Sequence, residues 1–311
     1  MEVEKTMATK LYGAIEAGGT KFVCVLARDI DDVVAETRIT TTTPAATLTA
    51  VVDFFATAQA VHGRIDAFGM GAFGPVDVRA GSPTWGRILD TPKPGWSGAD
   101  LVGPLMAQFT CPVAIDTDVN AAALAEARYG AGRDCSSLTY VTVGTGIGGG
   151  AVLEGRSLQG MLHPEMGHIR VRRDPRDAEF AGICPFHGDC LEGLASGPAI
   201  VVRWGAPLDQ LGNDHVAYSI IGNYLGQLAA TIALMLSSER IVLGGGVMSN
   251  VALLPHIRRS TQDMLNAYLP AARSDDWLNR YIVLPGLADR SGRNGAISLA
   301  MSALQRLGTS D

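Results

Sequence analysis

Two cysteines and two histidines in the middle of the chain have the spacing of a metal site. Cys184, His187 and Cys190 lie within seven residues, and His168 precedes them. Zinc prefers thiolate sulfur and imidazole nitrogen, and four such ligands leave no open position, which is the pattern of a structural site. In a reducing compartment this spacing favours a metal over a disulfide. We therefore expect one structural Zn²⁺ bound by His168, Cys184, His187 and Cys190.

Two acidic residues flank this cluster. Glu165 precedes His168, and Glu192 follows Cys190. A metal that orders the loop would also hold both carboxylates in place, where they can accept hydrogen bonds from sugar hydroxyl groups. The cluster and its two flanking acids therefore indicate a loop with a binding role.

Three glycine-rich turns are suited to approach phosphate groups. They are AGGTK at 17–21, GTGIGGG at 144–150 and GGG at 244–246. Glycine lets backbone N–H groups come close to a phosphate because it has no side chain and tolerates positive φ. Neither the Walker spacing nor a strand–GxGxxG–helix pattern is present. Each turn alone is also explained by ordinary hairpin geometry, although three exceed what hairpins require.

Asp118 is the candidate proton acceptor. It lies in IDTDVN at 115–120, at a predicted junction between a strand and a helix. Phosphoryl transfer to a hydroxyl group needs a carboxylate that accepts the proton while metal and backbone dipoles stabilise the phosphoryl oxygens. The alternative is a helix cap, because Asp is favoured at that position. The residues by themselves leave both interpretations open.

The elements around these motifs alternate between strands and helices, and one arrangement occurs twice. In each half a strand leads through a glycine turn into a returning strand, which indicates a duplicated α/β unit with a phosphate held between the halves. We place the boundary near 130–134, giving an N-terminal lobe of 1–130 and a C-terminal lobe of 131–311. Strands are predicted at 12–16, 22–27, 65–72, 138–143, 151–153 and 240–243, and helices at 44–62, 118–129 and 218–237.

Composition limits the class of partner. The 311 residues are 47% hydrophobic with a net charge of −6, so a large core is expected and a non-specific grip on nucleic acid or an anionic membrane is not. Residues 1–10 lack the apolar core of a secretion signal, and the apolar stretch 220–236 contains Asn223 and Gln227, which suits a buried helix. We expect a cytoplasmic protein with small-molecule partners.

Together these motifs resemble the ROK family, and within it the fructokinases. The similarity runs from Ile15 to about Gly295. It rests on EAGGTK (16–21), FGPVD (73–77), TPKPGW (91–96), DVNAA (118–122), GTGIGGG (144–150), EMGH (165–168), the Cys/His cluster ending in Glu192, and LGGGV (243–247).

The resemblance implies an α/β, actin-like and ribonuclease-H-like ATPase fold, with two lobes around a nucleotide and sugar cleft. It implies a homodimer that uses Mg²⁺ and ATP, with Asp118 as the catalytic base. The implied sugar-binding residues are Gly74, Thr91, Asp118, Glu165, His168 and Glu192. The implied ATP-binding residues are Gly18, Gly19, Thr20, Lys21, Gly144, Thr145, Gly146, Gly148, Gly244, Gly245 and Gly246.

Three positions depart from the family pattern. Glu16 stands where Asp is usual, Thr117 where Asn is common, and CPFH at 184–187 replaces Cys-x-Cys-Gly; His187 keeps the number of metal ligands. The family's repressors carry a helix-turn-helix domain before the kinase-like part, and only about a dozen residues precede Ile15 here.

The function expected from the resemblance is that of an ATP-dependent fructokinase acting on the 6-hydroxyl group of D-fructose. Two alternatives stay open: a kinase for glucose, mannose or an N-acetylated hexose, and a non-enzymatic sugar sensor. A hexose epimer differs by one hydroxyl group, worth about 1–3 kcal/mol against a buried partner, and the sequence does not place those partners.

Overall fold

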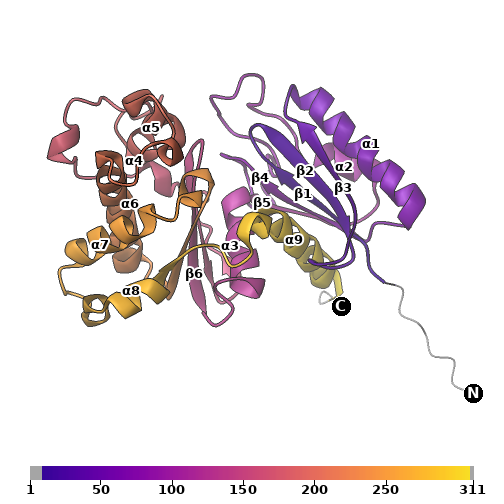
Figure 1. The fold of residues 1–311 in the computed structure, drawn as a ribbon. Coiled ribbons are helices and arrows are strands. Elements are labelled where there is room, and N and C mark those ends of the chain that lie inside the picture. Colours follow the sequence, from indigo (N-terminus) through magenta and orange to yellow (C-terminus); the bar gives the residue numbers. More distant parts are fainter. Residues whose placement is uncertain (1–8, 309–311) are drawn as a thin grey trace, which may run out of the picture. The chain divides into compact units, whose positions relative to one another are not determined.

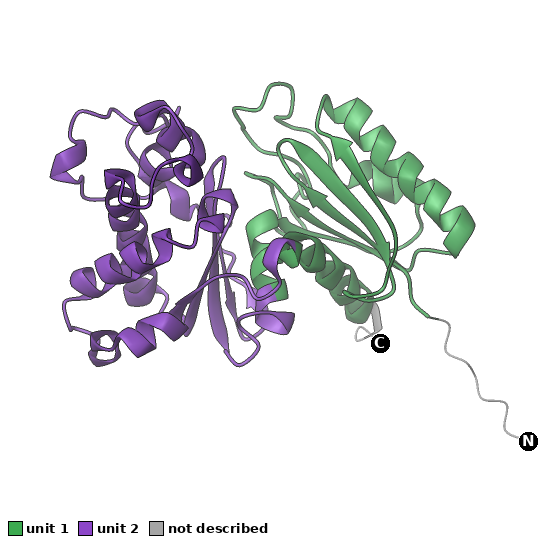
Figure 2. Cartoon of the chain, in the orientation of Figure 1, with its two compact units in different colours: residues 1–125, 290–311 green, residues 126–289 purple. Residues whose placement is uncertain are grey.

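Each half of the chain forms a five-stranded mixed sheet with helices packed on it (Figure 1). The computed structural model describes residues 9–308, so most of the segment interpreted at 1–10 lies outside the described residues. Two compact units make up the chain: unit 1 contains residues 1–125 and 290–311, and unit 2 contains residues 126–289 (Figure 2).

The sheet of unit 1 is built around a hairpin. β1 runs antiparallel to β2 and parallel to β4, and β4 runs parallel to β5. All six residues of β4 are buried, as expected for a central strand covered on both faces. The strand order is β3-β2-β1-β4-β5, with β1 (Tyr12–Ala17), β2 (Lys21–Ala27), β3 (Val33–Thr40), β4 (Ala67–Ala72) and β5 (Val113–Thr117).

Helices of unit 1 pack on this sheet. They are α1 (Pro44–His62), α2 (Gly103–Gln108) and α9 (Ser291–Gly308), together with the start of α3 (Asp118–Tyr129). α1 begins where Thr43 accepts a hydrogen bond from the N–H of Ala46, with Pro44 in the first turn. α9 packs on β4, β1 and β5. It comes so close to β4 that a Cβ at Gly69 would lie 2.0 Å from the carbonyl oxygen of Ala296.

One helix of the described residues, α1, is long and apolar enough to cross a membrane by length and composition alone. Its buried side chains Leu48, Val51 and Phe55 belong to the core of unit 1. The Phe55 ring lies 4.9 Å from the ring of Phe68 on β4. These contacts are those of a core helix of unit 1.

The sheet of unit 2 repeats the arrangement of unit 1. β6 runs antiparallel to β7 and parallel to β9, and β9 runs parallel to β10. The order is β10-β9-β6-β7-β8, with β6 (Ser137–Val143), β7 (Ile147–Leu153), β8 (Arg156–Ser157), β9 (Arg240–Gly244) and β10 (Ile282–Val283). The matching pairings confirm the predicted duplication.

The longest helix of unit 2, α6, is largely buried and packs on α7 and α4. Gly222 and Gly226 let α6 approach α7 closely, since a Cβ at either would lie within 2.5 Å of His256 or Ser260. The helices are α4 (Leu191–Ala195), α5 (Gly197–Trp204), α6 (Val216–Met235), α7 (Leu253–Leu265) and α8 (Asp275–Tyr281). Single 3₁₀ turns are η1 (Met166–His168), η2 (Pro175–Asp177), η3 (Leu208–Gln210), η4 (Gly246–Ser249), η5 (Pro270–Arg273) and η6 (Ala288–Arg290).

Two differences from the sequence-based expectation concern the division of the chain and the second glycine turn. Residues 290–311 belong to unit 1, whereas the sequence assigned 131–311 to one lobe; the physical reason is that α9 covers β1, β4 and β5. The second returning strand begins at Ile147, inside the glycine run, so Gly148 pairs with Thr142 as part of β7. Gly149 is needed there because a Cβ would lie 2.4 Å from the sulfur of Met166.

Candidate active site

Asp118 is the first residue of α3, directly after β5 ends at Thr117. The cap of this helix is Thr117, whose hydroxyl oxygen accepts the N–H of Asn120 at 3.1 Å. The buried carboxylate of Asp116 fixes the junction, accepting the N–H of Thr117 at 2.8 Å and the side-chain amide of Asn120 at 2.7 Å. One oxygen of Asp118 accepts the N–H of Val119 at 2.8 Å. Because Thr117 makes the capping bond, Asp118 has a second oxygen available for chemistry.

The surroundings of Asp118 suit a proton acceptor. Burial raises the pKa of its carboxyl group, the nearby charge of Glu16 raises it further, and the Val119 N–H partly opposes both, for a pKa of about 7. A general base works best when its pKa lies near the working pH. Asp118 is therefore poised to accept a proton near neutral pH.

The side chain of Glu16 extends to the start of α9. A Cβ at Gly292 would lie 2.6 Å from one carboxylate oxygen of Glu16, so this carboxylate lies directly against the start of α9. The first turn of a helix favours negative charge because its N–H groups point outward. The acidic residue before the first glycine turn thus lies next to a helix that is distant in sequence.

The first glycine turn is fixed through its carbonyl oxygens. The N–H of Gly18 donates to the carbonyl oxygen of Lys21 at 2.9 Å. The hydroxyl group of Thr41 donates to the carbonyl oxygen of Gly18 at 2.8 Å. The ammonium group of Lys93 donates to the carbonyl oxygen of Gly19 at 2.5 Å. The turn is thus held by two segments that follow it in unit 1.

Two predicted sugar ligands of unit 1, Gly74 and Thr91, lie on loops anchored to the same core. The Gly74–Pro75 peptide bond is cis. Thr91 begins a loop in which its N–H donates to the hydroxyl oxygen of Ser97 at 3.2 Å. Trp96 anchors this loop: it is fully buried, and its indole N–H donates to the carbonyl oxygen of Thr42 at 2.9 Å.

In unit 2 the second glycine turn is held by a predicted sugar ligand. One carboxylate oxygen of Glu192 accepts the N–H of Ile147 at 2.9 Å. The same oxygen would lie 2.7 Å from a Cβ at Gly146. Glu192 therefore connects the end of the Cys/His loop to the turn, a structural contact that the sequence did not indicate.

A hollow of about 350 Å³ in unit 2 brings three predicted ATP-binding residues together: Gly144, Thr145 and Gly246. The N–H of Gly197, at the start of α5, donates to the carbonyl oxygen of Gly144 at 2.8 Å, so a helix N-terminus adjoins the turn. Gly245 adopts φ of +90°, where a side chain would be strained. The other lining residues are mainly apolar: Gly197, Pro198, Ile200, Val201, Pro207, Leu208, Asp209, Val247 and Asn250.

This hollow has the volume and the mainly apolar lining of a small-molecule site. The lining residues on α5 and η3 were not predicted, because short apolar runs have the same pattern whether they line a binding site or pack in the core. The glycine turns were the only local signal.

The four predicted metal ligands come together in unit 2. Their ligand atoms all lie within 4.8 Å of one another. The Nδ1 atom of His168 lies 3.8 Å from the sulfur of Cys184 and 3.6 Å from that of Cys190, and the Nδ1 atom of His187 lies 3.6 Å from the sulfur of Cys184. Zinc bond lengths of about 2.3 Å to sulfur and 2.0 Å to nitrogen put tetrahedral ligands about 3.5 Å apart. The donor set therefore fits Zn²⁺.

His168 belongs to the EMGH segment, which packs directly on β7. A Cβ at Gly167 would lie 1.8 Å from the carbonyl oxygen of Ile147, so the segment tolerates only glycine there. The preceding Glu165 is half-exposed and lies 3.4 Å from the ring nitrogen of the buried His163. Since His168 turns Nδ1 toward the cysteines, its Nε2 atom lies on the opposite side of the ring.

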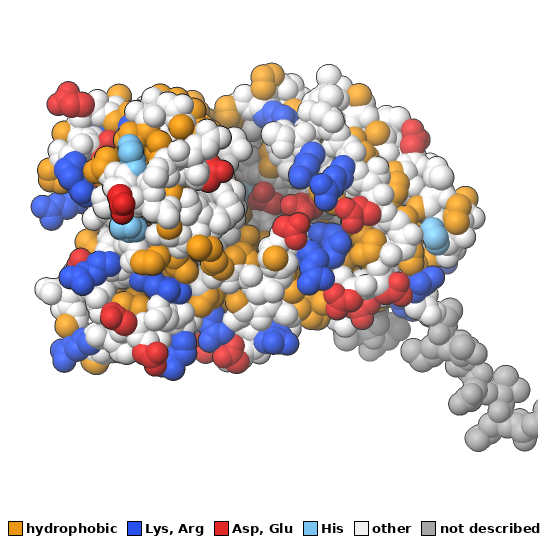
Figure 3. Space-filling view, viewed as in Figure 1, with side chains coloured by type: hydrophobic (Ala, Val, Ile, Leu, Met, Phe, Trp, Pro, Cys, Tyr) orange, Lys and Arg blue, Asp and Glu red, His pale blue; other side chains and the backbone are white. Residues whose placement is uncertain are grey.

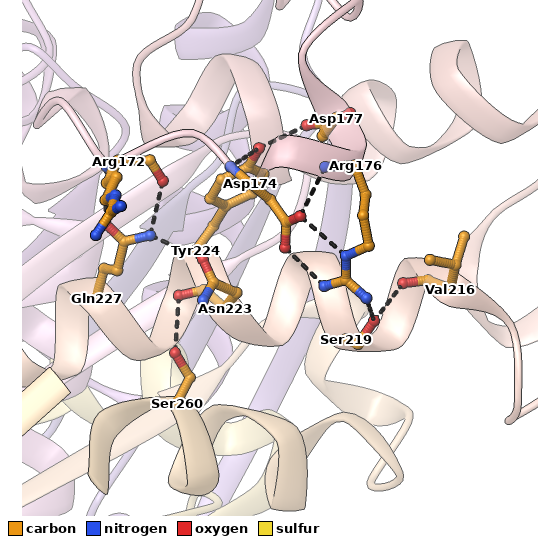
Figure 4. Close-up of polar contacts among 10 residues, drawn as sticks. All are labelled: Arg172, Asp174, Arg176, Asp177, Val216, Ser219, Asn223, Tyr224, Gln227 and Ser260. Carbon is orange, nitrogen blue, oxygen red and sulfur yellow. Dashed lines mark hydrogen bonds and ion pairs between the residues drawn. The ribbon is translucent and has the colours of Figure 1, made fainter. Parts of the chain in front are cut away.

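The segment after His168 is fastened to α6 by buried polar contacts (Figure 4). The amide of Gln227 exchanges two hydrogen bonds with the backbone of Arg172, at 2.8 and 2.9 Å. The hydroxyl group of Tyr224 donates to Asp177 at 2.6 Å and accepts the N–H of Asp174 at 3.2 Å. Burial raises the pKa of Tyr224 to about 12, with the Asp177 bond adding to it, so the hydroxyl keeps its proton. Gln227, which interrupts an apolar run in the sequence, anchors the segment between His168 and Cys184.

The protein-family model of the ROK family matches residues 12–303 of this chain. The chain belongs to the ROK family. This ROK chain is 45% identical over 297 residues to the fructokinase of Zymomonas mobilis subsp. mobilis, covering 94% of the chain and 97% of that relative. It is 41% identical over 295 residues to the fructokinase of Pediococcus pentosaceus, covering 95% and 99%.

Among solved structures, the ROK hexokinase from Thermus thermophilus is similar, with a TM-score of 0.72 and 27% identity over 95% of this chain and 99% of that one. The predicted actin-like α/β fold and the family assignment are thereby confirmed. Of the predicted sugar ligands, Gly74, Thr91 and Asp118 lie in unit 1, and Glu165, His168 and Glu192 lie in unit 2.

Proposed function

We propose that this chain is an ATP-dependent fructokinase that transfers the γ-phosphoryl group of ATP to the 6-hydroxyl group of D-fructose. The observation that carries the proposal is the near full-length match to relatives named fructokinase at 45% and 41% identity. Asp118 supports it chemically, because a carboxylate with a pKa near 7 stands at the end of β5, close enough to Glu16 for their charges to interact.

Asp118 is the base of the proposed reaction. The hydroxyl oxygen of the sugar bonds to the γ-phosphorus, the bond from that phosphorus to the bridging oxygen breaks, ADP leaves, and the hydroxyl proton passes to Asp118. Mg²⁺ accompanies ATP and neutralises charge on its phosphates. The carboxylate of Glu16, at the end of β1, is suited to bind that ion directly or through water.

ATP is proposed to bind through its phosphates to the glycine turns and through its adenosine to the hollow beside α5. The backbone of Gly144, Thr145 and Gly246 forms one end of that hollow, which supports this placement. The sugar's hydroxyl groups are proposed to bind Gly74 and Thr91 from unit 1 and Glu165, His168 and Glu192 from unit 2.

The Cys/His cluster is proposed to hold a structural Zn²⁺ that supplies folding energy and orders the sugar-binding loop. His168 would serve twice, binding zinc through Nδ1 while Nε2 faces a sugar hydroxyl. Metal ligation of one nitrogen fixes the tautomer of the ring, so the other becomes a defined hydrogen-bonding group.

The setting proposed for this enzyme is a cytoplasmic homodimer without nucleic-acid or membrane partners. On the face shown in Figure 3, Lys and Arg side chains are interspersed with Asp and Glu, and no broad basic area appears on that face. The net charge of −6 also disfavours binding to polyanions.

The deciding experiment is an ADP-release assay with fructose, glucose, mannose and N-acetylmannosamine. We expect fructose to give the highest kcat/KM and the product, examined by NMR, to be fructose 6-phosphate. Far better use of another hexose would remove the fructokinase assignment and keep the kinase. No ADP release with any hexose would favour the sugar sensor.

A further inference from the structure

We infer that Lys93 is a further catalytic residue, whose ammonium group binds a non-bridging oxygen of the transferred phosphoryl group. The inference rests on the proposed function, because it needs ATP at the first glycine turn and a sugar beside Thr91. It assigns the loop at 91–96 a part in the chemistry, beyond contact with the sugar.

The position of the Lys93 ammonium group carries the inference. It lies 2.5 Å from the carbonyl oxygen of Gly19, at the middle of the first glycine turn, although the two residues are far apart in sequence. Among the described residues of unit 1, no carboxylate oxygen lies within 4 Å of this ammonium group. A partly buried cation therefore stands at a phosphate-binding turn with a neutral partner.

The backbone of Lys93 is fixed, so its side chain points to this turn for a structural reason. The N–H of Lys93 donates to the hydroxyl oxygen of Thr91 at 3.4 Å, and its carbonyl oxygen accepts the N–H of Trp96 at 3.2 Å. Trp96 is held in turn between the rings of Phe22 and Phe73, whose centroids lie 5.8 and 5.4 Å away. Lys93 thus connects a predicted sugar ligand to the phosphate turn.

Lysine is rare in this chain, so its presence at position 93 is notable. The chain contains 21 arginines and only 4 lysines, and two of the four, Lys21 and Lys93, lie at the first glycine turn. A lysine ammonium group is a compact point charge on a flexible stem, whereas arginine presents a broad planar fork. In a chain that otherwise uses arginine, lysine stands where a small cation can move between neighbouring oxygen atoms.

Once a phosphoryl group is present, the Lys93 ammonium group gains by leaving the carbonyl oxygen of Gly19 for a phosphoryl oxygen. A cation binds an anionic oxygen more strongly than a neutral carbonyl oxygen, because both partners of the bond are then charged. The negative charge that spreads over the phosphoryl oxygens during transfer strengthens the bond further. The role of Lys93 is to bind the phosphoryl oxygen, while the sugar's proton goes to Asp118.

The competing explanation is a purely structural role, a static tie, in which Lys93 only joins the loop at 91–96 to the first glycine turn. A static tie affects folding and binding of both substrates, whereas an interaction made mainly in the transition state affects kcat. The two explanations therefore predict different kinetic changes in the same variant.

The test compares wild type, Lys93→Met, Lys93→Arg and the control Lys10→Met, which removes an exposed lysine paired with Asp66. Steady-state kinetics with fructose and ATP and thermal unfolding are measured for each. We expect Lys93→Met to lower kcat by about 10²- to 10³-fold, with both KM values and the Tm little changed. Lys93→Arg should recover part of kcat, and Lys10→Met should match wild type.

The inference is overturned if kcat of Lys93→Met stays within threefold of wild type, or if only KM rises. Should Lys93→Met fail to fold, Lys93→Gln is tested against the same limits, because it keeps a hydrogen-bond donor and removes the charge. If wild type prefers another hexose, the proposed substrate fails, and Lys93 is judged by the same limits with that hexose.

Discussion

The pH dependence of catalysis tests the role of Asp118 most directly. Its pKa is raised from 3.8 to about 7, first by burial and then by the charge of Glu16. A base acts in its deprotonated form, so activity is present above pH 7 and is lost as the pH falls through that value. With a single ionisation at 7, about 91% of Asp118 is deprotonated at pH 8 and about 9% at pH 6, so kcat/KM should fall about tenfold between them.

The assay measures kcat/KM for fructose from pH 5.5 to 8.5 by coupled ADP release, in excess Mg²⁺ so that ATP stays fully ionised. Glu16→Gln removes the neighbouring negative charge, so its acidic limb should move to lower pH. Asp118→Asn, which cannot accept the proton, should lose about 10²- to 10⁴-fold in rate and show no such limb. A flat profile between pH 6 and 8 in wild type, or an unchanged limb in Asp118→Asn, would refute the reasoning.

Three further predictions concern the loops around the site. Protein prepared without chelator should contain one zinc per chain by elemental analysis, and Cys184→Ser should lose the metal and lower the Tm, whereas an absence of zinc would contradict the site. Gly146→Ala should lower kcat/KM by about 10- to 100-fold with zinc content unchanged, because the new Cβ would lie 2.7 Å from the carboxylate of Glu192; unaltered kinetics would oppose this. Tyr224→Phe should lower the free energy of unfolding by about 1–3 kcal/mol in urea titrations, since Asp177 loses a buried donor; Val202→Ala, at an exposed position, is the control.

The motifs that sequence could locate are those whose geometry is local. The hairpin β1–β2 was predicted within a residue, because its glycine turn and its apolar runs are contiguous. The helix after Asp118 was predicted for the same reason. The cap, however, was left open between Thr117 and Asp118, since both are favoured caps and only coordinates show which oxygen accepts the N–H of Asn120.

What sequence could not supply are contacts between distant segments. Nothing in the composition of α9 says that it covers β4, because the complementary features are single glycines such as Gly69. The link between Lys93 and Gly19 is equally invisible, since a lone lysine carries no pattern. Glu192 was expected to meet only sugar, and its hold on Ile147 depends on how the Cys/His loop folds back.

The discontinuity of unit 1 has a consequence for how the protein is made. During synthesis the five strands of its sheet leave the ribosome before unit 2, yet α9, which packs on β4, β1 and β5, emerges only after all of unit 2. Until then the face of β4 that carries Ala67 and Gly69 has no helix against it, and neither has the carboxylate of Glu16. Unit 2 is continuous and can fold while the ribosome is still translating, but the surroundings of Asp118 are completed by α9, which is translated after unit 2. Nascent chains stalled before residue 291 would therefore be inactive and prone to aggregate, and they would depend on chaperones in a way that the complete enzyme does not.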